Sequence, residues 1–309
     1  MANEFPSPTS YPGDAGYGIA PPGFRLPART RLGPVRLQVS DLERSLDYYG
    51  EVLGFRVVGR DAGGAALGPR DSDEILVELR GGASAVAPGH PPRLGLYHVA
   101  YLLPSREDLG RFLRHIAELG ERAGASDHYV SEAIYLRDPD GLGIEVYADR
   151  PRSTWTTNGR ELRMATVPLN VPEILAVTGD SRWNGLPSGS TVGHVHLHVG
   201  DLDDAAHFYH EALGFDTVVW SYPGALFLSA GGYHHHLGLN TWAGSRAEPA
   251  HADEPRLMEW TIEVPDAESV AAAARSLETA GYPVERSSDG ADFVTRDPWG
   301  TALRVRAAR

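Results

Sequence analysis

The sequence of 309 residues contains no cysteine, which excludes disulfides and thiolate metal sites. Any bound metal ion must therefore rest on His, Asp and Glu side chains, and a cytoplasmic protein is expected. Positive charge is also scarce, since 28 Lys and Arg against 41 Asp and Glu give a formal net charge of −13. Nucleic-acid backbones and anionic lipids bind clustered basic side chains. We therefore expect a small molecule as partner, and neither nucleic acid nor a membrane.

Long apolar runs are missing as well. No segment approaches the roughly 18 apolar residues of a membrane span, and the first residues lack the basic and apolar regions of a signal peptide. Thirty-five glycines and 23 prolines favour many short elements joined by turns over long helices. Residues 1–30 are predicted to be a Pro/Gly-rich N-terminal tail, and the remaining length suits two domains.

An internal repeat is the most informative feature of the sequence. Residues 35–55, VRLQVSDLERSLDYYGEVLGF, match residues 195–215, VHLHVGDLDDAAHFYHEALGF, at an offset of 160. Each copy begins with the alternation of a strand, continues with an Asp N-cap and a helical pattern, and stops at Leu-Gly-Phe. A second pair, residues 96–120 and 257–281, also reads as a strand followed by a helix. The chain therefore carries two kinds of repeated unit.

A Pro/Gly turn and a final strand follow the helices of the second pair. RDPDGLGIEVYA at residues 137–148 recurs as RDPWGTALRVRA at residues 296–307. The sequence thus predicts four units of strand, helix and several strands, which we name 1a, 1b, 2a and 2b in chain order. Two units each are assigned to a first domain at 31–150 and a second at 191–309, with a linker at 151–190.

Comparison of the units shows where ligand-type side chains occur. In the a units, His194 of unit 2a matches Pro34 of unit 1a. In the b units, His98 and Glu145 of unit 1b match Glu259 and Arg304 of unit 2b, respectively. If units 1b and 2a face one another, two histidines and one carboxylate converge, and units 1a and 2b form a structural copy. Such a set leaves metal positions open for substrate and O₂, as in non-haem Fe(II) oxygenases. Zinc accepts the same ligands, so the residue types leave the metal open.

Several segments resemble one known superfamily. The paired units, the segment VGDLDDAAHFYHEALGF and the segment YLRDPDGLGIEVYADRP resemble the vicinal oxygen chelate superfamily, which includes glyoxalase I and the extradiol catechol dioxygenases. The combination of LYHVAYLLPSREDLG, DHYVSEAIYLRDPDG, GHVHLHVGDL and SAGGYHHHLGLNTWAG is similar to bacterial two-domain catechol 2,3-dioxygenases, over about residues 31–309. The resemblance implies an α+β fold of four βαβββ units paired into two vicinal-oxygen-chelate domains, each an incomplete barrel.

The resemblance also implies an activity, namely Fe(II)-dependent extradiol cleavage of a catechol by O₂ in aromatic catabolism. His98, Glu145 and His194 stand at the positions of the metal ligands, with His196 as the alternative to His194. Mn(II) or Zn(II) are the alternatives to Fe(II), and a homo-oligomer is compatible with the sequence. The competing functions are a glyoxalase-like isomerase or lyase and a small-molecule-binding protein. An isomerase of this kind needs a second carboxylate near residue 236, where the chain has none.

The segment GGYHHHLGLN at residues 231–240 lies where extradiol enzymes carry an acid/base residue. Histidine suits this role because its unperturbed pKa is about 6.5. The spacing before Leu-Gly-Leu favours His235, and alternation along a strand would turn His234 and His236 the other way. A shift of one residue in register would transfer the role to His236.

The resemblance singles out two further side chains. Tyr135, ten residues before Glu145, matches the tyrosine that the family directs toward the substrate oxygen. His128 resembles a histidine that contacts the substrate or supports the ligands. By contrast, Trp155, Trp242 and Trp299 are expected to pack in the fold rather than to form a platform for the substrate.

Overall fold

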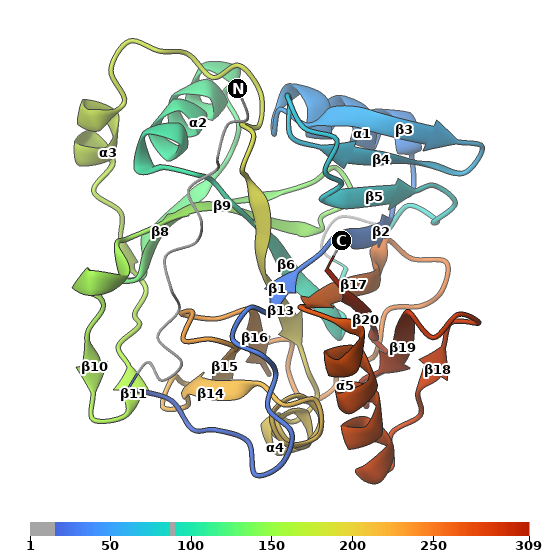
Figure 1. The fold of residues 1–309 in the computed structure, drawn as a ribbon. Coiled ribbons are helices and arrows are strands. Elements are labelled where there is room, and N and C mark those ends of the chain that lie inside the picture. The colour runs from blue at the N-terminus through green and yellow to red at the C-terminus, as the bar shows by residue number, and fades with distance from the viewer. Residues whose placement is uncertain (1–15, 87–89, 309) are drawn as a thin grey trace, which may run out of the picture.

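Two curved mixed sheets of nine strands each form the centre of the molecule (Figure 1). The structure is a computed structural model and describes residues 16–86 and 90–308. Half of the predicted N-terminal tail, residues 1–15, lies outside the described residues. Its second half lies along unit 2a, where Ile19 bridges to Thr217 and the Arg25 guanidinium pairs with Asp216 at 2.7 Å.

The first sheet, which we call the site sheet, combines units 1b and 2a. Its strand order is β12-β7-β8-β9-β6-β13-β16-β15-β14. The strands are β6 (Gly95–Leu102), β7 (Gly124–Asp127), β8 (Ser131–Arg137), β9 (Gly143–Asp149), β12 (Val167–Pro168), β13 (Thr191–His198), β14 (Asp216–Val219), β15 (Ala225–Ser229) and β16 (Leu237–Asn240). Strands β6 and β13, the first strands of their units, pair antiparallel at its centre. The expected meeting of units 1b and 2a is therefore confirmed.

The second sheet, which we call the companion sheet, combines units 1a and 2b. Its order is β18-β19-β20-β17-β2-β5-β4-β3, with β1 paired to β17. The strands are β1 (Arg31–Leu32), β2 (Val35–Gln38), β3 (Arg56–Asp61), β4 (Gly64–Gly68), β5 (Val77–Arg80), β17 (Arg256–Val264), β18 (Glu285–Arg286), β19 (Asp292–Arg296) and β20 (Ala302–Ala307). Each sheet thus takes one unit from each half of the chain, and the division into domains at 31–150 and 191–309 stays a prediction.

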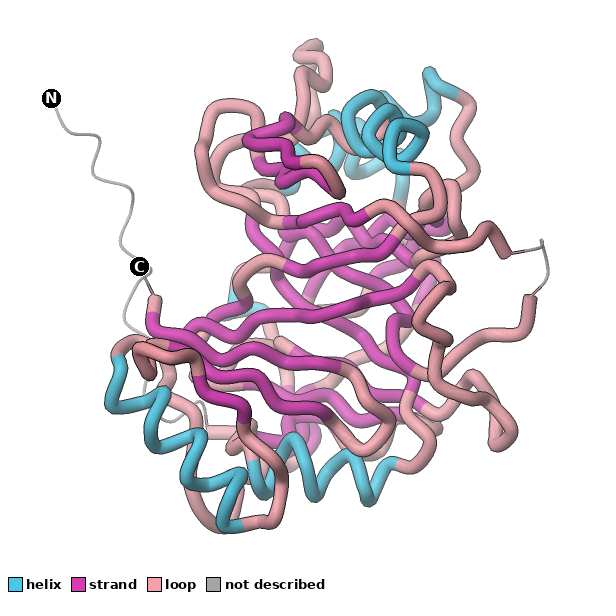
Figure 2. Tube along the Cα trace, turned by 90° about the vertical axis from the view of Figure 1, so that its right-hand side faces the viewer, coloured by secondary structure: helices cyan, strands magenta, loops and turns pink. Residues whose placement is uncertain are grey.

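Helices lie outside the strands (Figure 2). They are α1 (Leu42–Glu51), α2 (Arg106–Leu119), α3 (Val171–Val177), α4 (Leu202–Ala206) with the π-helical turn η2 (His207–Ala212), and α5 (Ala267–Thr279). The predicted Asp N-caps are confirmed, because Asp41 accepts the N–H of Arg44 and Asp201 accepts those of Asp203 and Asp204. These caps satisfy N–H groups that have no partner inside the helix.

The predicted linker at 151–190 has structure of its own. It contains the 3-10 turn η1 (Arg152–Thr154), the short hairpin strands β10 (Thr157–Asn158) and β11 (Glu161–Leu162), β12 and α3. Strand β12 adds to the edge of the site sheet by pairing with β7. Residues of the segment between β11 and β12 line the cavity described below.

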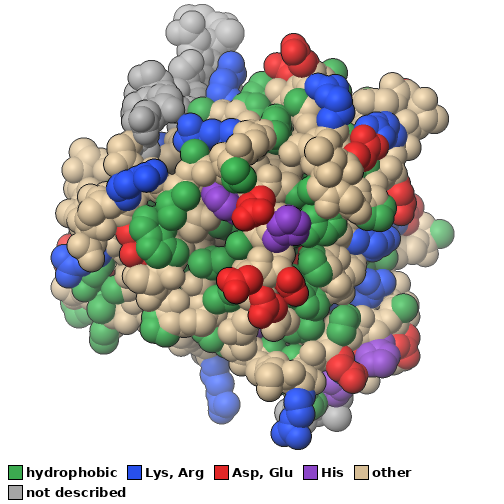
Figure 3. Space-filling view, turned by 90° about the horizontal axis from the view of Figure 1, so that it is seen from below, with side chains coloured by type: hydrophobic (Ala, Val, Ile, Leu, Met, Phe, Trp, Pro, Cys, Tyr) green, Lys and Arg blue, Asp and Glu red, His purple; other side chains and the backbone are tan. Residues whose placement is uncertain are grey.

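The surface agrees with the charge balance of the sequence. Acidic side chains gather near the middle of the face shown in Figure 3, close to histidine side chains. In the part of the chain that the structure describes, no helix is both long enough and apolar enough to span a membrane.

One buried carboxyl group lies in the core away from the ligand-type residues. Asp138 accepts the N–H groups of Asp140 and Leu142 on one oxygen, at 2.9 and 2.8 Å, while its other oxygen has no partner among the described residues. Burial raises the pKa of Asp138 to about 7. The folded state therefore holds this group protonated at a pH where the unfolded chain has lost the proton.

Replacing Asp138 by Asn is expected to stabilise the protein at pH 8 relative to the wild type. A raised pKa makes the wild type lose stability as the pH rises from about 4 through about 7, whereas the amide carries no charge to bury. The gain at pH 8 has an upper limit of about 4 kcal/mol and should shrink toward pH 4. Urea unfolding of both proteins at pH 5 and pH 8 measures it, and an equal difference at both pH values would contradict the assignment.

Candidate metal centre and active-site cavity

The register of three neighbouring strands positions the predicted metal ligands. Ala100 of β6 lies opposite His194 of β13 on one side and Glu145 of β9 on the other. His98 precedes Ala100 by two residues and thus faces the same side of the sheet. Because Ala100 has a small side chain, the three longer ones can converge above it. The predicted meeting of His98, Glu145 and His194 is confirmed.

The three side chains form a compact buried group. The Nε2 atoms of His98 and His194 lie 3.0 and 3.1 Å from Oε2 of Glu145, and 3.3 Å from each other. All three residues are at most 5% exposed. With metal–ligand bonds of about 2.1 Å, neighbouring ligands at right angles lie about 3 Å apart. The donor atoms are therefore spaced to hold one divalent cation.

The protonation states suit metal binding. Burial lowers the pKa of His98 and of His194, in spite of the opposing effect of Glu145. Burial alone would raise the pKa of Glu145, but the two histidines outweigh it and hold this pKa well below its ordinary value. Neutral imidazoles and an ionised carboxylate are the forms that bind a metal ion.

The companion sheet carries ion pairs at the equivalent positions. Arg304 donates to Glu259 at 2.9 Å, and these residues are the counterparts of Glu145 and His98. Arg36, the counterpart of His196, donates to Glu78 at 2.8 Å. Among residues 16–86 and 90–308, the one group of three or more ligand-type side chains that could hold a metal ion is that of the site sheet. Units 1a and 2b thus form the copy without ligands that the repeat predicts.

A cavity of about 210 Å³ adjoins the ligand group. The three ligands, Tyr135, His128 and His235 all line it. The larger side chains in the rest of its wall are Tyr97, Met164, His196, Tyr222, Phe227 and Trp242. Glu145 is the one formally charged side chain among its described lining residues. The cavity therefore suits a small, flat, uncharged ligand held between aromatic rings.

The triple-histidine segment forms a turn, so the expectation of a strand there is wrong. Positive φ angles at Gly231 and Gly232 bend the chain, and β16 begins only after the third histidine. His235 nevertheless lines the cavity, with its ring centroid 4.1 Å from that of His194. His236 lies outside the lining, where its Nδ1 accepts the backbone N–H of Ala230 at 3.2 Å. The structure thus places His235, and not His236, beside the ligands.

Tyr135 and His128 contact each other at the cavity wall. Tyr135 of β8 lies directly opposite Glu145 in the sheet, and its hydroxyl is 2.6 Å from Nε2 of His128. The Nδ1–H of His128 donates to the carbonyl of Ala165 at 2.7 Å. In a neutral imidazole Nε2 then accepts, and the tyrosine hydroxyl donates to it. Burial raises the pKa of Tyr135 well above its ordinary value, so the phenol keeps its proton.

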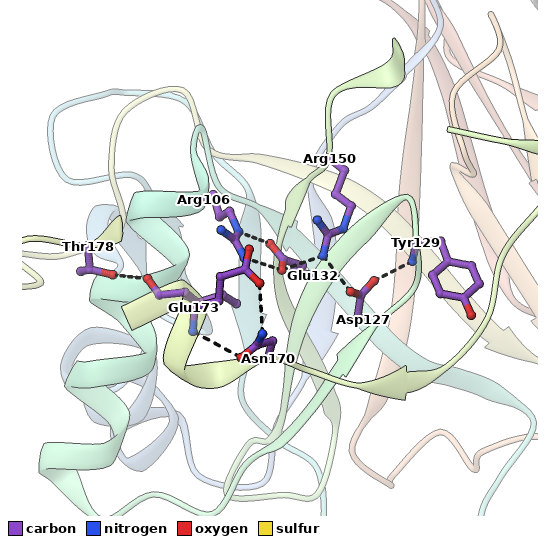
Figure 4. A network of polar contacts seen from close by, with 9 residues as sticks. Arg106, Asp127, Tyr129, Glu132, Arg150, Asn170, Glu173 and Thr178 are labelled. Carbon is purple, nitrogen blue, oxygen red and sulfur yellow. Dashed lines mark hydrogen bonds and ion pairs between the residues drawn. The ribbon is translucent and has the colours of Figure 1, made fainter. Parts of the chain in front are cut away.

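An ionic network around the buried Glu132 anchors the hairpin that carries His128 (Figure 4). Arg150 bridges Asp127 and Glu132 at 2.7 and 2.8 Å, and Arg106 of α2 donates to Glu132 at 2.5 Å. Asp127 also accepts the N–H of Tyr129, which has a positive φ of 69°. Holding a non-glycine residue in this conformation costs on the order of 1 kcal/mol. The network therefore fixes the turn from which His128 reaches the cavity.

Tyr97 and Trp242 line the cavity although neither was predicted as a site residue, and His196 was named only as an alternative metal ligand. Strand β6 has a register irregularity at Tyr97, because His98 pairs with His196 and Leu96 pairs with Leu197. This bulge lets Tyr97 and His98, although consecutive, both line the cavity. Trp242, expected to pack in the fold, lines the cavity and is 44% exposed. In the sequence, the alternation of His194 and His196 along one strand was the signal that both side chains face the site. The buried Nε2 of His196 has no hydrogen-bond partner among the described residues.

Comparison with known proteins agrees with the fold and the site. Residues 31–146 and 191–305 match the family described as the Glyoxalase/Bleomycin resistance protein/Dioxygenase superfamily. The chain is 43% identical over 272 residues to a catechol-2,3-dioxygenase of Bacillus subtilis (strain 168), covering 87% of this chain and 94% of that protein. It is 26% identical to biphenyl-2,3-diol 1,2-dioxygenase 2 of Rhodococcus globerulus, over 58% of this chain and 93% of that one.

Solved structures share the fold at low sequence identity. A putative dioxygenase from Bacillus subtilis subsp. subtilis str. 168 superposes with a TM-score of 0.62 at 14% identity, covering 92% of this chain and 86% of that chain. Glyoxalase I from Zea mays superposes with a TM-score of 0.53 at 18% identity, over 90% and 92% of the two chains. The repeat, the two sheets, the family match and the identity to a full-length relative together establish that this chain belongs to the glyoxalase/bleomycin resistance protein/dioxygenase superfamily.

Proposed function

We propose that this protein is an Fe(II)-dependent extradiol dioxygenase that opens the ring of catechol, or of a substituted catechol, with O₂. The observation that carries this proposal is the buried group of His98, Glu145 and His194 in the wall of an aromatic-lined cavity. Two histidines and one carboxylate are the ligand set of non-haem Fe(II) oxygenases. The catechol-2,3-dioxygenase relative, at 43% identity, supports the same activity.

The proposed roles follow from what each group can do. When bound, the metal supplies charge stabilisation and the redox chemistry that the reaction with O₂ requires. His235 stands beside His194 at the cavity and is assigned as the group that accepts a proton from a substrate hydroxyl and later returns it. Tyr135 and His128, joined at 2.6 Å, are assigned to hydrogen bonding with the substrate oxygens.

The competing functions receive less support from the cavity. A glyoxalase-like isomerase would use a second carboxylate, whereas Glu145 is the one carboxylate among the described lining residues. A protein that only sequesters a ligand has no need of a buried ligand group for a metal ion. The isomerase therefore lacks a carboxylate that it would use, and the binding protein leaves the ligand group without a role. Mn(II) or Zn(II) would fit the same donor atoms, so metal identity is part of the test.

The proposal is tested by loading the protein anaerobically with Fe(II) and adding catechol and then air. We expect O₂ uptake together with a yellow ring-cleavage product, and no activity with Zn(II), which has no redox chemistry. A catechol that carries a carboxylate should be a poor substrate, because no Lys or Arg is among the described residues that line the cavity. No O₂ uptake across a panel of catechols, with one metal ion bound per chain, would favour the isomerase or lyase function instead.

A further inference from the structure

A chain of hydrogen bonds leads from the cavity through the triple histidine to a carboxylate. Nδ1 of His235 lies 2.8 Å from Nδ1 of His234, and Nε2 of His234 lies 2.8 Å from Oδ1 of Asp149. His234 is completely buried, whereas the side chain of Asp149, at the end of β9, is 27% exposed. Both ring nitrogens of His234 thus have a hydrogen-bond partner, although the ring does not line the cavity.

The chemistry of the partners sets the direction of these bonds. The carboxylate of Asp149 can only accept, so Nε2 of His234 carries the proton and donates it. A neutral His234 then presents the lone pair of Nδ1, which accepts the Nδ1–H of His235. The remaining nitrogen of His235, Nε2, is left with a lone pair. This nitrogen has no hydrogen-bond partner among the described residues, and its ring lines the cavity.

We infer that Asp149 and His234 are positioning residues that hold His235 in the tautomer with an unprotonated Nε2. The inference rests on the proposed function, in which His235 is the group that accepts the substrate proton. The arrangement is like that of a catalytic histidine whose tautomer is fixed by a carboxylate. Here the imidazole of His234 lies between the carboxylate and the catalytic histidine. Neither His234 nor Asp149 lines the cavity, although the ring of His234 meets that of His194 edge to face, with centroids 6.2 Å apart. Their proposed effect on the substrate passes through His235.

The packing around His234 holds this arrangement in place. The ring of Trp155 meets that of His234 edge to face, with centroids 5.4 Å apart. The hydroxyl of Tyr233 donates to the same Asp149 oxygen at 3.2 Å and lies 2.7 Å from the hydroxyl of Tyr147. Asp149 is therefore held from two directions, and His234 has little freedom to turn away from it.

Two substitutions at position 234 separate the two hydrogen bonds. Asn places an oxygen near Nδ1 and can still accept the proton of His235, whereas Gln reaches toward Asp149 and loses that acceptor. We expect His234→Gln and Asp149→Asn to lower kcat by about 10- to 100-fold at an unchanged KM and metal content. An Asn side chain at 149 can donate to Nε2 of His234 and so favour the reversed proton arrangement. His234→Asn should stay within a few-fold of the wild type.

His236→Asn is the matched control, since His236 is a buried neighbour that lies outside the cavity. Equal losses of kcat in His234→Asn, His234→Gln and His236→Asn would indicate general damage to the turn and overturn the inference. Wild-type kcat in folded His234→Gln and Asp149→Asn would overturn it as well.

A second readout does not depend on the proposed function. Nitrogen-15 spectra of histidine-labelled wild-type protein without metal report directly which nitrogen of His235 carries the proton, with His235→Asn used to assign the signals. We expect the Nδ1–H form in the wild type and its loss in His234→Gln. An Nε2–H form in the wild type would overturn the inference. If the protein gives the expected spectrum but cleaves no catechol, the inference about the tautomer stands and the proposed function is refuted.

Discussion

Replacing Glu145 by Gln is expected to lower the metal affinity by more than about 100-fold and to abolish O₂ uptake. Removing a partner that only orients a metal ligand typically costs 10- to 100-fold in affinity or activity, so the loss of a ligand should exceed that. Glu145 also supplies the one formal negative charge of the ligand group, opposite two neutral histidines. Gln keeps the shape of the side chain and removes this charge. Metal content after dialysis against a weak chelator measures the effect.

Glu259→Gln is the control for this prediction. Glu259 stands in the companion sheet at the position equivalent to His98, where it pairs with Arg304. The variant should lose some stability with this ion pair but keep one metal ion per chain. If Glu145→Gln bound metal as tightly as the wild type, the carboxylate would not be a ligand and the assignment of the site would fail.

Replacing His235 by Asn should lower kcat by about 10²- to 10⁴-fold, the range typical of a general acid or base, with the metal still bound. Asn keeps a polar group near Nδ1, next to His234, and removes the nitrogen that is left for the substrate. The ligand group is left intact because it comes from β6, β9 and β13. Single-turnover rates at saturating catechol, together with metal content, separate this effect from a loss of metal.

The comparison with His236→Asn decides between the two histidines that the sequence leaves open. His236 accepts a backbone N–H outside the cavity, so its replacement should leave the single-turnover rate near that of the wild type. The opposite pattern, with His236 essential and His235 dispensable, would mean that the turn adopts a different register when the enzyme works.

The ligand group could be predicted from the sequence because it depends on regular structure. His98, Glu145 and His194 lie on strands with clear alternation, and the repeat identifies their counterparts as residues that cannot form the same site. Strand pairing then needs only the standard geometry of a sheet to bring them together. The family resemblance added the acid/base role of the triple segment, and the spacing before Leu-Gly-Leu favoured His235 within it.

The irregular parts of the site could not be predicted from sequence alternation and the repeat. The bulge at Tyr97 breaks the alternation that predicts which residues share a face. The glycines at 231 and 232 form a turn where a strand was expected, and the partner of His234 comes from the end of a strand 85 residues away. Trp242 was interpreted as a packing residue because a single aromatic side chain gives no signal of exposure. Each of these features depends on contacts between distant segments.

The pairing of β6 with β13 also affects how the protein can be divided. Cutting the chain within the segment 151–190 would give one fragment with His98 and Glu145 and another with His194, and neither would hold the complete ligand group. Each fragment would also expose one edge of a strand that is central in the whole protein, and such an edge is a template for association. Mixing the two fragments would rebuild both sheets at once, because each sheet draws on both halves. The repeated units are therefore interlocked, and neither half of the chain alone carries the whole ligand group.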